Sequence, residues 1–179
     1  MNNTDNTEIA VLGGGCFWCI EPVFLALKGV AEVIPGYCGG HVDNPSYEQV
    51  CEKNTGHIEV VQIKFDPTVI SFEVLLQVFF ATHDPTTVDR QGNDVGPQYA
   101  SAIFYQSEQQ RVIAQELIVR VQQLLGQPVV TQLRAAEHFW AAEGYHHDYY
   151  ARNPGQGYCQ VVIAPKLAKF RQHFAALLA

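Results

Sequence analysis

Residues 8–27, EIAVLGGGCFWCIEPVFLAL, decide how the N-terminal part of the chain folds. They begin with a short apolar run, which is typical of a buried strand, and three glycines end this run. After the glycines, apolar side chains recur with the spacing of a helix, on one stripe that carries Phe17, Ile20, Phe24 and Leu27. The stretch predicts a strand, a glycine turn and a helix, with Cys16 where the helix begins.

The rest of the chain alternates between further strand and helix patterns. Strands are predicted at residues 30–37, 58–65, 99–105 and 129–133, helices at 72–81, 108–125 and 166–178, and polar loops at 39–55 and 82–97. Residues 137–154 are rich in aromatic residues and histidine and show no clear periodicity. This alternation favours an α/β (α+β) two-layer sandwich, in which helices pack on one mixed β-sheet.

The length and composition suit one domain. The chain has 179 residues, 47% of them hydrophobic, and such a chain buries roughly two thirds of its unfolded surface. We expect residues 1–7 to form a flexible N-terminal tail and residues 8–179 to form a single domain.

Charge and hydropathy exclude several classes of partner. A net charge of -7 with 11 basic residues leaves no electropositive face for a phosphate backbone, so we expect no nucleic-acid partner. No apolar run approaches the roughly 18 residues of a membrane span, and the first residues lack the pattern of a signal peptide. We therefore expect a cytoplasmic protein, and a monomer.

The cysteines carry the strongest functional signal. Their number is odd, which in a reducing compartment indicates redox chemistry or metal binding before structural disulfides: Cys16, Cys19, Cys38, Cys51 and Cys159. A thiol attacks as its thiolate, and the unpaired N–H groups of a first helical turn lower a thiol pKa. Cys16 is thus a candidate nucleophile, although a small buried cysteine after a turn would fit the same residues.

Two other uses of the C-x-x-C at residues 16–19 stay open. The spacing is that of a dithiol exchanger of the thioredoxin kind, and also that of half a zinc site. No second C-x-x-C completes four zinc ligands, and the adjacent His146, His147 and Asp148 rarely aim at one ion. We expect no metal, and we keep a zinc-binding or thioether-binding module as a third alternative.

Glu59 lies in an apolar row. Period-two alternation puts Glu59 on the face of the predicted strand that also carries Val61, Ile63 and Phe65. Apolar surroundings disfavour the charged form of a carboxyl group, so its pKa should rise and it could act as a general acid. The alternative is that Glu59, near the start of the strand, reaches solvent.

Three motifs in order resemble the peptide methionine sulfoxide reductase A family: GGCFWCIE at residues 14–21, GYCGG at 36–40 and TGHIE at 55–59. The match continues through HDPTT at 83–87, QGNDVG at 91–96 with Gln98 and Tyr99, and NP at 153–154. It covers most of the chain, from about residue 9 to residue 166. The resemblance implies that residues 8–179 form a single catalytic domain, a two-layer sandwich with a ferredoxin-like core.

The resemblance also implies an activity and the residues that perform it. The activity is reduction of the S epimer of methionine sulfoxide, free or in oxidised proteins, which repairs oxidative damage. Cys16 would attack the sulfoxide sulfur and become a sulfenic acid, and Phe17 and Trp18 would wall the pocket for the substrate methyl group. Four side chains would hold and protonate the sulfoxide oxygen: Glu59, Tyr37, Asp94 and Tyr99.

Recycling is implied to use a second cysteine. Cys159, which follows a glycine-bearing stretch that we expect to be mobile, would condense with the sulfenic acid to a disulfide. Thioredoxin or another thiol would then reduce this disulfide, and no bound cofactor is implied. Cys38 departs from the usual residue of the family and is a candidate third redox-active thiol.

Overall fold

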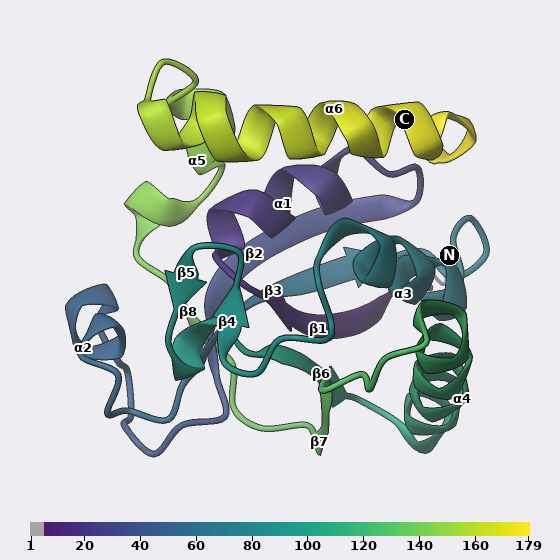
Figure 1. Ribbon diagram of the computed structural model, residues 1–179, viewed down its shortest axis with the longest axis horizontal. Helices are drawn as coiled ribbons and strands as arrows, with labels where there is room; N and C mark the ends of the chain where they lie inside the picture. The colour runs from purple at the N-terminus through teal and green to yellow at the C-terminus, as the bar shows by residue number, and fades with distance from the viewer. Residues whose placement is uncertain (1–5) are drawn as a thin grey trace, which may run out of the picture.

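The computed structural model describes residues 6–179, and residues 1–5 of the predicted tail lie outside this part. A six-stranded sheet in the order β7-β6-β1-β3-β2-β8 forms its centre (Figure 1). Its strands are β1 (Glu8–Gly14), β2 (Val30–Cys38), β3 (Ile58–Phe65), β6 (Ser101–Tyr105), β7 (Gln132–Ala135) and β8 (Trp140–Ala141). Only β6 and β7 pair in parallel, so the sheet is mixed, as predicted.

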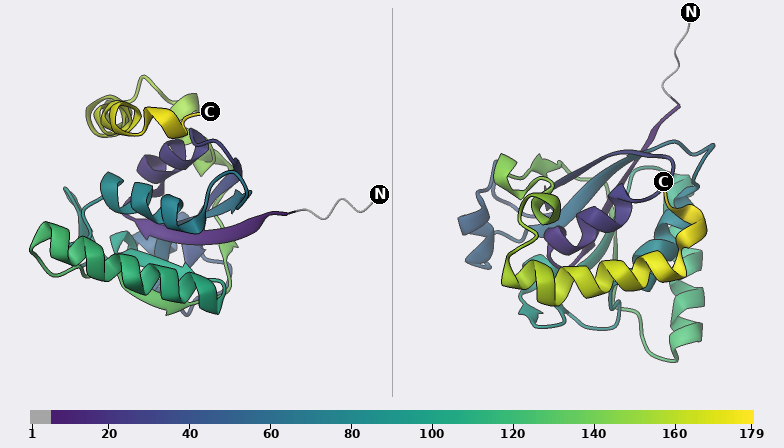
Figure 2. Two further views of the ribbon diagram at one scale, coloured as in Figure 1. Left: turned by 90° about the vertical axis from the view of Figure 1, so that its right-hand side faces the viewer. Right: turned by 90° about the horizontal axis from the view of Figure 1, so that it is seen from above.

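Helices cover one face of this sheet. The main ones are α1 (Phe17–Leu25), α3 (Phe72–Thr82) and α4 (Glu108–Leu125), and α6 (Ala164–His173) lies outside α1 (Figure 2). The order β1-α1-β2-β3-α3-β6, with β6-β1-β3-β2 adjacent in the sheet, is a ferredoxin-like core, so the predicted fold class is confirmed. Within residues 6–179, no helix has both the length and the apolar character needed to cross a bilayer.

The alternation of side chains along the strands builds a core on each face of the sheet. The larger core lies beneath the helices and includes Leu12, Phe24, Ile63, Leu76 and Ile103. The smaller cluster on the opposite face includes Val11, Ile58, Val60 and Phe104. Side chains at alternate positions of a strand face the same side, so Glu59 points to the same side of the sheet as Ile63. This is the side that the helices cover, where the start of α1 also lies.

Shorter elements complete the structure and include most differences from the prediction. They are α2 (Tyr47–Cys51), β4 (Arg90–Gln91), β5 (Asp94–Val95), α5 (Tyr149–Arg152), the 3₁₀ turns Pro97–Tyr99, Gly144–His146 and Ala175–Leu177, and the π-helical turn Cys159–Ile163. The two predicted loops thus contain α2 and a small hairpin. Tyr99 ends a 3₁₀ turn that Pro97 starts, instead of beginning strand β6.

Candidate active site

Cys16 occupies the N-cap position of α1, as predicted. The turn before it depends on Gly15, whose φ is +98°, a conformation that favours glycine. A Cβ at Gly15 would lie 2.7 Å from the Cβ of Gln91, so the turn also packs closely against the β4–β5 hairpin. Cys16 itself is 8% exposed.

The protonation of the two neighbouring thiols differs from the sequence expectation. Burial raises the pKa of the Cys16 thiol, and its hydrogen bond to Cys19 and the charge of Glu59 raise it further. The hydrogen bond from Cys16 instead lowers the pKa of Cys19 to about 7, against burial and with help from the positive charge of Lys166. We expected the helix start to lower the pKa of Cys16, but desolvation outweighs it, so Cys16 is the protonated partner of the pair.

Glu59 is buried beside the start of α1. It is 1% exposed, and its Oε1 accepts a hydrogen bond of 3.2 Å from the backbone N–H of Phe17. Burial raises the pKa of Glu59 to about 8, the Phe17 N–H opposes this rise, and the charge of Asp94 adds to it. The alternative of a solvent-exposed Glu59 is therefore excluded, and a carboxylic acid near neutral pH binds the N–H of the residue next to Cys16.

Tyr37 stands directly opposite Glu59 in the β2–β3 register. It is fully buried, and its hydroxyl donates a hydrogen bond of 3.3 Å to Oε1 of Glu143. Glu143 also accepts from the backbone N–H of Tyr47, at 3.1 Å, and from the hydroxyl of Tyr145, at 3.0 Å. Burial first, and then the charge of Glu143, raise the pKa of Tyr37, so its phenol keeps its proton.

Asp94 in β5 and Tyr99 at the end of the following 3₁₀ turn lie near the thiol pair. Asp94 Oδ2 accepts a hydrogen bond of 2.9 Å from the hydroxyl of Tyr158, and that hydroxyl lies 3.2 Å from the sulfur of Cys19. Tyr99 is half-buried and packs against the cluster that contains Cys16. Burial, and then the charge of Glu59, raise the pKa of Tyr99.

Phe17 and Trp18 are covered by other parts of the chain. Phe17 is fully buried and its ring packs against Tyr37 and His146. Trp18 stacks on Tyr149, with ring centroids 3.9 Å apart and planes 9° apart, and its Nε1 donates to Nδ1 of His146 at 3.0 Å. One face of the indole is therefore occupied by residue 149 of the C-terminal segment.

Cys159 joins the same cluster from the C-terminal side. It is fully buried at the start of the π-helical turn and packs with Cys16, Cys19 and Ile163. We expected the glycine-bearing residues before Cys159 to be mobile, but Cys159 itself begins a helical turn. All five cysteines are free thiols, and Cys38 is buried on the opposite face of the sheet, where burial raises its pKa to about 11.

A cavity of about 410 Å³ opens beside Cys16. Its lining includes Cys16, Cys19, Asp94, Tyr158 and Lys166. Among residues 6–179, no group of three or more His, Cys, Asp or Glu side chains is placed to hold a metal ion. The arrangement offers two thiols, a protonated carboxylic acid and several phenols, which together suit thiol redox chemistry with proton transfer.

Comparison with known families decides the assignment. The family model described as peptide methionine sulfoxide reductase matches residues 8–178. The chain belongs to this family. The reductase is 57% identical to peptide methionine sulfoxide reductase MsrA of Chromobacterium violaceum, over 96% of this chain and 98% of that protein. It is 54% identical to MsrA of Thermus thermophilus, over 96% and 97% of the two chains.

Solved structures agree with the family assignment. Mxr1 from Saccharomyces cerevisiae in reduced form superposes with a TM-score of 0.83 at 30% identity, over 89% of this chain and 92% of that chain. Methionine sulfoxide reductase A of Corynebacterium diphtheriae superposes with a TM-score of 0.76 at 32% identity, over 86% and 78%. The family predicted from three sequence motifs is confirmed, and the reductase carries out thiol-dependent reduction of methionine sulfoxide.

The structure also adds residues to the site that the sequence did not suggest. Tyr158 bridges Cys19 and Asp94, Tyr149 covers Trp18, and Lys166 places a positive charge near both thiols. The signal in the sequence for these two tyrosines is their position. Tyr149 lies shortly before the Asn153-Pro154 motif, and Tyr158 directly precedes Cys159. Nothing in the helical pattern of α6 distinguished Lys166 from a solvent-exposed lysine.

Proposed function

We propose that the reductase acts on the S epimer of methionine sulfoxide, free or in oxidised proteins, with Cys16 as the nucleophile. The observation that carries this proposal is the buried Glu59, whose carboxyl group binds the N–H directly after Cys16 and whose pKa is raised to about 8 by burial. A sulfoxide sulfur becomes a good electrophile once its oxygen gains a proton or strong hydrogen bonds. A protonated Glu59 beside the thiol supplies that proton.

The proposed step conserves atoms and protons. Cys16 sulfur bonds to the sulfoxide sulfur, and Glu59 gives its proton to the oxygen. The thiol proton of Cys16 leaves to Cys19, whose pKa of about 7, lowered by the hydrogen bond from Cys16, makes it the nearest acceptor. The S–O bond of the substrate and the new S–S bond then break as the hydroxyl group passes to the Cys16 sulfur. This leaves a sulfenic acid on Cys16 and releases methionine with its thioether, and the proton on Cys19 returns to Glu59.

The phenols and Asp94 are proposed to hold the sulfoxide oxygen. Tyr37 and Tyr99 both keep their protons, because burial raises the pKa of each, and so both can donate hydrogen bonds. The hydroxyl of Tyr37 would exchange its bond to Glu143 for one to the substrate. Phe17 and Trp18 would contact the substrate methyl group, which requires Tyr149 to leave the face of Trp18.

Cys159 is the proposed resolving cysteine. It packs in the same cluster as Cys16, which supports a short path from the sulfenic acid to a disulfide. Thioredoxin is the proposed reductant: Mxr1, to which this chain is similar, has also been solved in complex with Trx2. We also propose a cytoplasmic monomer whose residues 8–179 form one catalytic domain, since the family model matches residues 8–178.

A dithiol exchanger is the second candidate, because Cys19 has a lowered pKa and bonds to Cys16. The two functions separate in one assay, in which consumption of thioredoxin is followed with each epimer of methionine sulfoxide alone. The proposal predicts thiol consumption with the S epimer, none with the R epimer and none without sulfoxide. Reduction of protein disulfides without sulfoxide, at a comparable rate, would instead establish the exchanger.

A further inference from the structure

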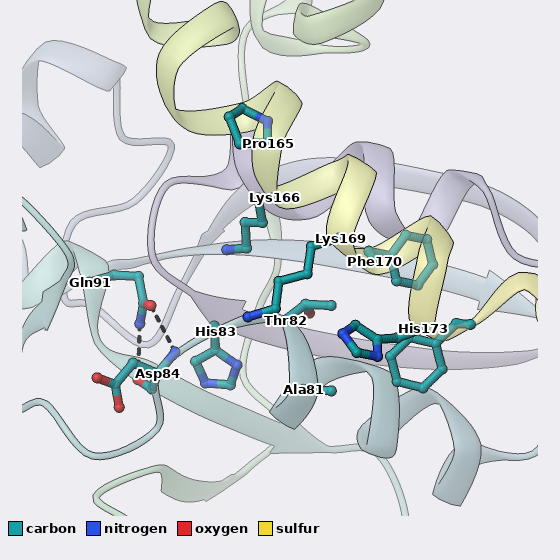
Figure 3. Close-up of a pocket in the computed structure, with 11 residues that line it drawn as sticks. Ala81, Thr82, His83, Asp84, Gln91, Pro165, Lys166, Lys169, Phe170 and His173 are labelled. Carbon is teal, nitrogen blue, oxygen red and sulfur yellow. Dashed lines mark hydrogen bonds between the residues drawn. The ribbon is translucent and has the colours of Figure 1, made fainter.

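A second and larger cavity lies between the C-terminal end of α3 and helix α6 (Figure 3). Its volume is about 840 Å³, roughly twice that of the cavity beside Cys16. The end of α3 contributes Thr82 and His83, and α6 contributes Lys166, Lys169, Phe170 and His173. The cavity therefore combines an apolar floor with several basic side chains, in a protein whose net charge is -7.

Neither lysine of this cavity forms an ion pair with a carboxylate. Figure 3 shows the side chains of Lys166 and Lys169 extending from α6 into the cavity. Within residues 6–179, no carboxylate oxygen lies within 4.0 Å of either ammonium group. Lys166 is half-buried, and burial lowers the pKa of its ammonium group, whereas the negative charges of Cys19, Cys16 and Asp94 raise it. A bound anion would stabilise the charged form further.

The other charges at the cavity leave it positive. Asp84 is the carboxylate at its edge, and Thr86 already binds that group through its backbone N–H, at 2.9 Å, and its hydroxyl. His83 is neutral, since burial lowers its pKa to about 4. Its two ring nitrogens are bonded to the carbonyl of Phe79 and the hydroxyl of Ser101, so it offers nothing to a ligand.

This cavity adjoins the site of Cys16. Gln91 and Lys166 line both cavities. The Gln91 side chain packs on Gly15, the residue before Cys16, and its amide binds the backbone N–H and carbonyl of Asp84 at 2.8 and 2.9 Å. Gln91 is thus a fixed wall, with the nucleophile on one side and the lysine-lined cavity on the other.

We propose that the cavity between α3 and α6 is a binding subsite for acidic residues that flank methionine sulfoxide in a peptide or protein. The inference rests on the proposed function, because the flanking residues are those of a substrate whose sulfoxide reaches Cys16. Carboxylates of the substrate bind Lys169 and Lys166, and the aliphatic parts of Asp and Glu side chains lie on Phe170. Lys169 is then a specificity-determining residue of the reductase.

Peptide kinetics test the subsite directly. Three blocked pentapeptides carry a central S-epimer methionine sulfoxide, flanked on each side by two Glu, two Ala or two Lys residues. The overall charge of the protein favours the Lys peptide, whereas the subsite favours the Glu peptide. We expect kcat/KM at low salt to be about tenfold higher for the Glu peptide than for the Lys peptide, with the difference lost at high salt.

Two charge reversals on one helix give the matched control. Lys169→Glu should abolish or invert the preference, whereas Arg171→Glu should keep it, since Arg171 is exposed on α6 and does not line the cavity. Arg171→Glu should also reduce free S-epimer methionine sulfoxide at the wild-type rate. Equal kcat/KM for the three peptides, a preference for the Lys peptide, or equal effects of the two reversals would overturn the subsite. Failure of wild-type protein to reduce the free sulfoxide would instead refute the proposed function.

Discussion

At the scale of single residues, the protonation of Glu59 determines when the proposed chemistry can run. The carboxyl group is almost completely buried, and burial raises its pKa to about 8 even though the N–H of Phe17 favours the charged form. Below that pH the group is mostly an acid and can give a proton to the sulfoxide oxygen. Above it the group is a carboxylate, which repels a developing negative charge on that oxygen.

Replacing Glu59 by Gln should slow methionine release in a single turnover by about 10²–10⁴-fold, because the amide keeps the shape but cannot deliver a proton. The wild-type rate should fall as the pH rises through about 8, where Glu59 loses its proton, and the variant should lack this fall. Rapid-quench measurements between pH 6 and 10 would follow both. If the variant keeps the wild-type rate and pH profile, the proton comes from another group, with Tyr37 and Tyr99 the next candidates.

The same pKa shift links protein stability to pH. The ordinary pKa of Glu59 is 4.5, and burial raises it to about 8 in the folded protein, so between these values the folded state holds a proton that the unfolded state has lost. The free energy of unfolding therefore falls as the pH rises across this range. Relative to wild type, Glu59→Gln should gain roughly a few kcal/mol at pH 8 and much less at pH 4. Urea denaturation at both pH values checks this, and an equal difference at the two would contradict it.

At the scale of elements, the turn between β1 and α1 fixes the direction of the nucleophile. Gly15 has a φ of +98°, and the β4–β5 hairpin fills the space that a side chain would need. The strand, the turn and the helix could be predicted from residues 8–27 because strong periodicity surrounds the glycines. The packing of Gln91 against the turn could not be predicted in this way, since this contact joins segments 76 residues apart in the sequence.

Gly15→Ala should therefore lower stability by about 1–3 kcal/mol and reduce kcat/KM, because both the backbone strain and the contact with Gln91 displace Cys16. Gly157→Ala is the control, since an added Cβ there meets nothing within 4 Å, and it should stay within about 0.5 kcal/mol of wild type. Thermal denaturation and steady-state kinetics would measure both effects. Equal behaviour of the two variants would show that the turn has no special role.

Short or irregular elements were beyond prediction from the sequence. The helix α2 has five residues, too few for an amphipathic pattern, and only the capping box of Ser46 and Gln49 marks it. The glycines before Cys159 suggested mobility, yet Cys159 starts a π-helical turn that leads into α6. Burial against the thiol cluster outweighs the flexibility of the residues that precede it.

At the scale of the whole molecule, the site is assembled from segments that only the fold brings together. Cys16 and Glu59 were identifiable from their local surroundings, one at a helix start and the other in an apolar row. The protonated state of Cys16 could not be predicted from the sequence, because its desolvation depends on the C-terminal segment that carries Tyr158 and Cys159. That segment lies more than 140 residues away in the sequence, and its glycines predicted a mobile stretch instead of a cover over Cys16.

The central claim is that Cys16 takes the oxygen and becomes a sulfenic acid, which Cys159 then converts to a disulfide. The variant Cys159→Ser tests this claim most directly. The variant is mixed with S-epimer methionine sulfoxide without reductant, methionine is counted, and dimedone traps any sulfenic acid before mass spectrometry. We predict one methionine per enzyme, dimedone on Cys16 and little turnover with thioredoxin, while oxidised wild type shows a Cys16–Cys159 disulfide. A dominant disulfide from Cys16 to Cys19 or Cys38, with normal thioredoxin-coupled turnover in the variant, would contradict the account.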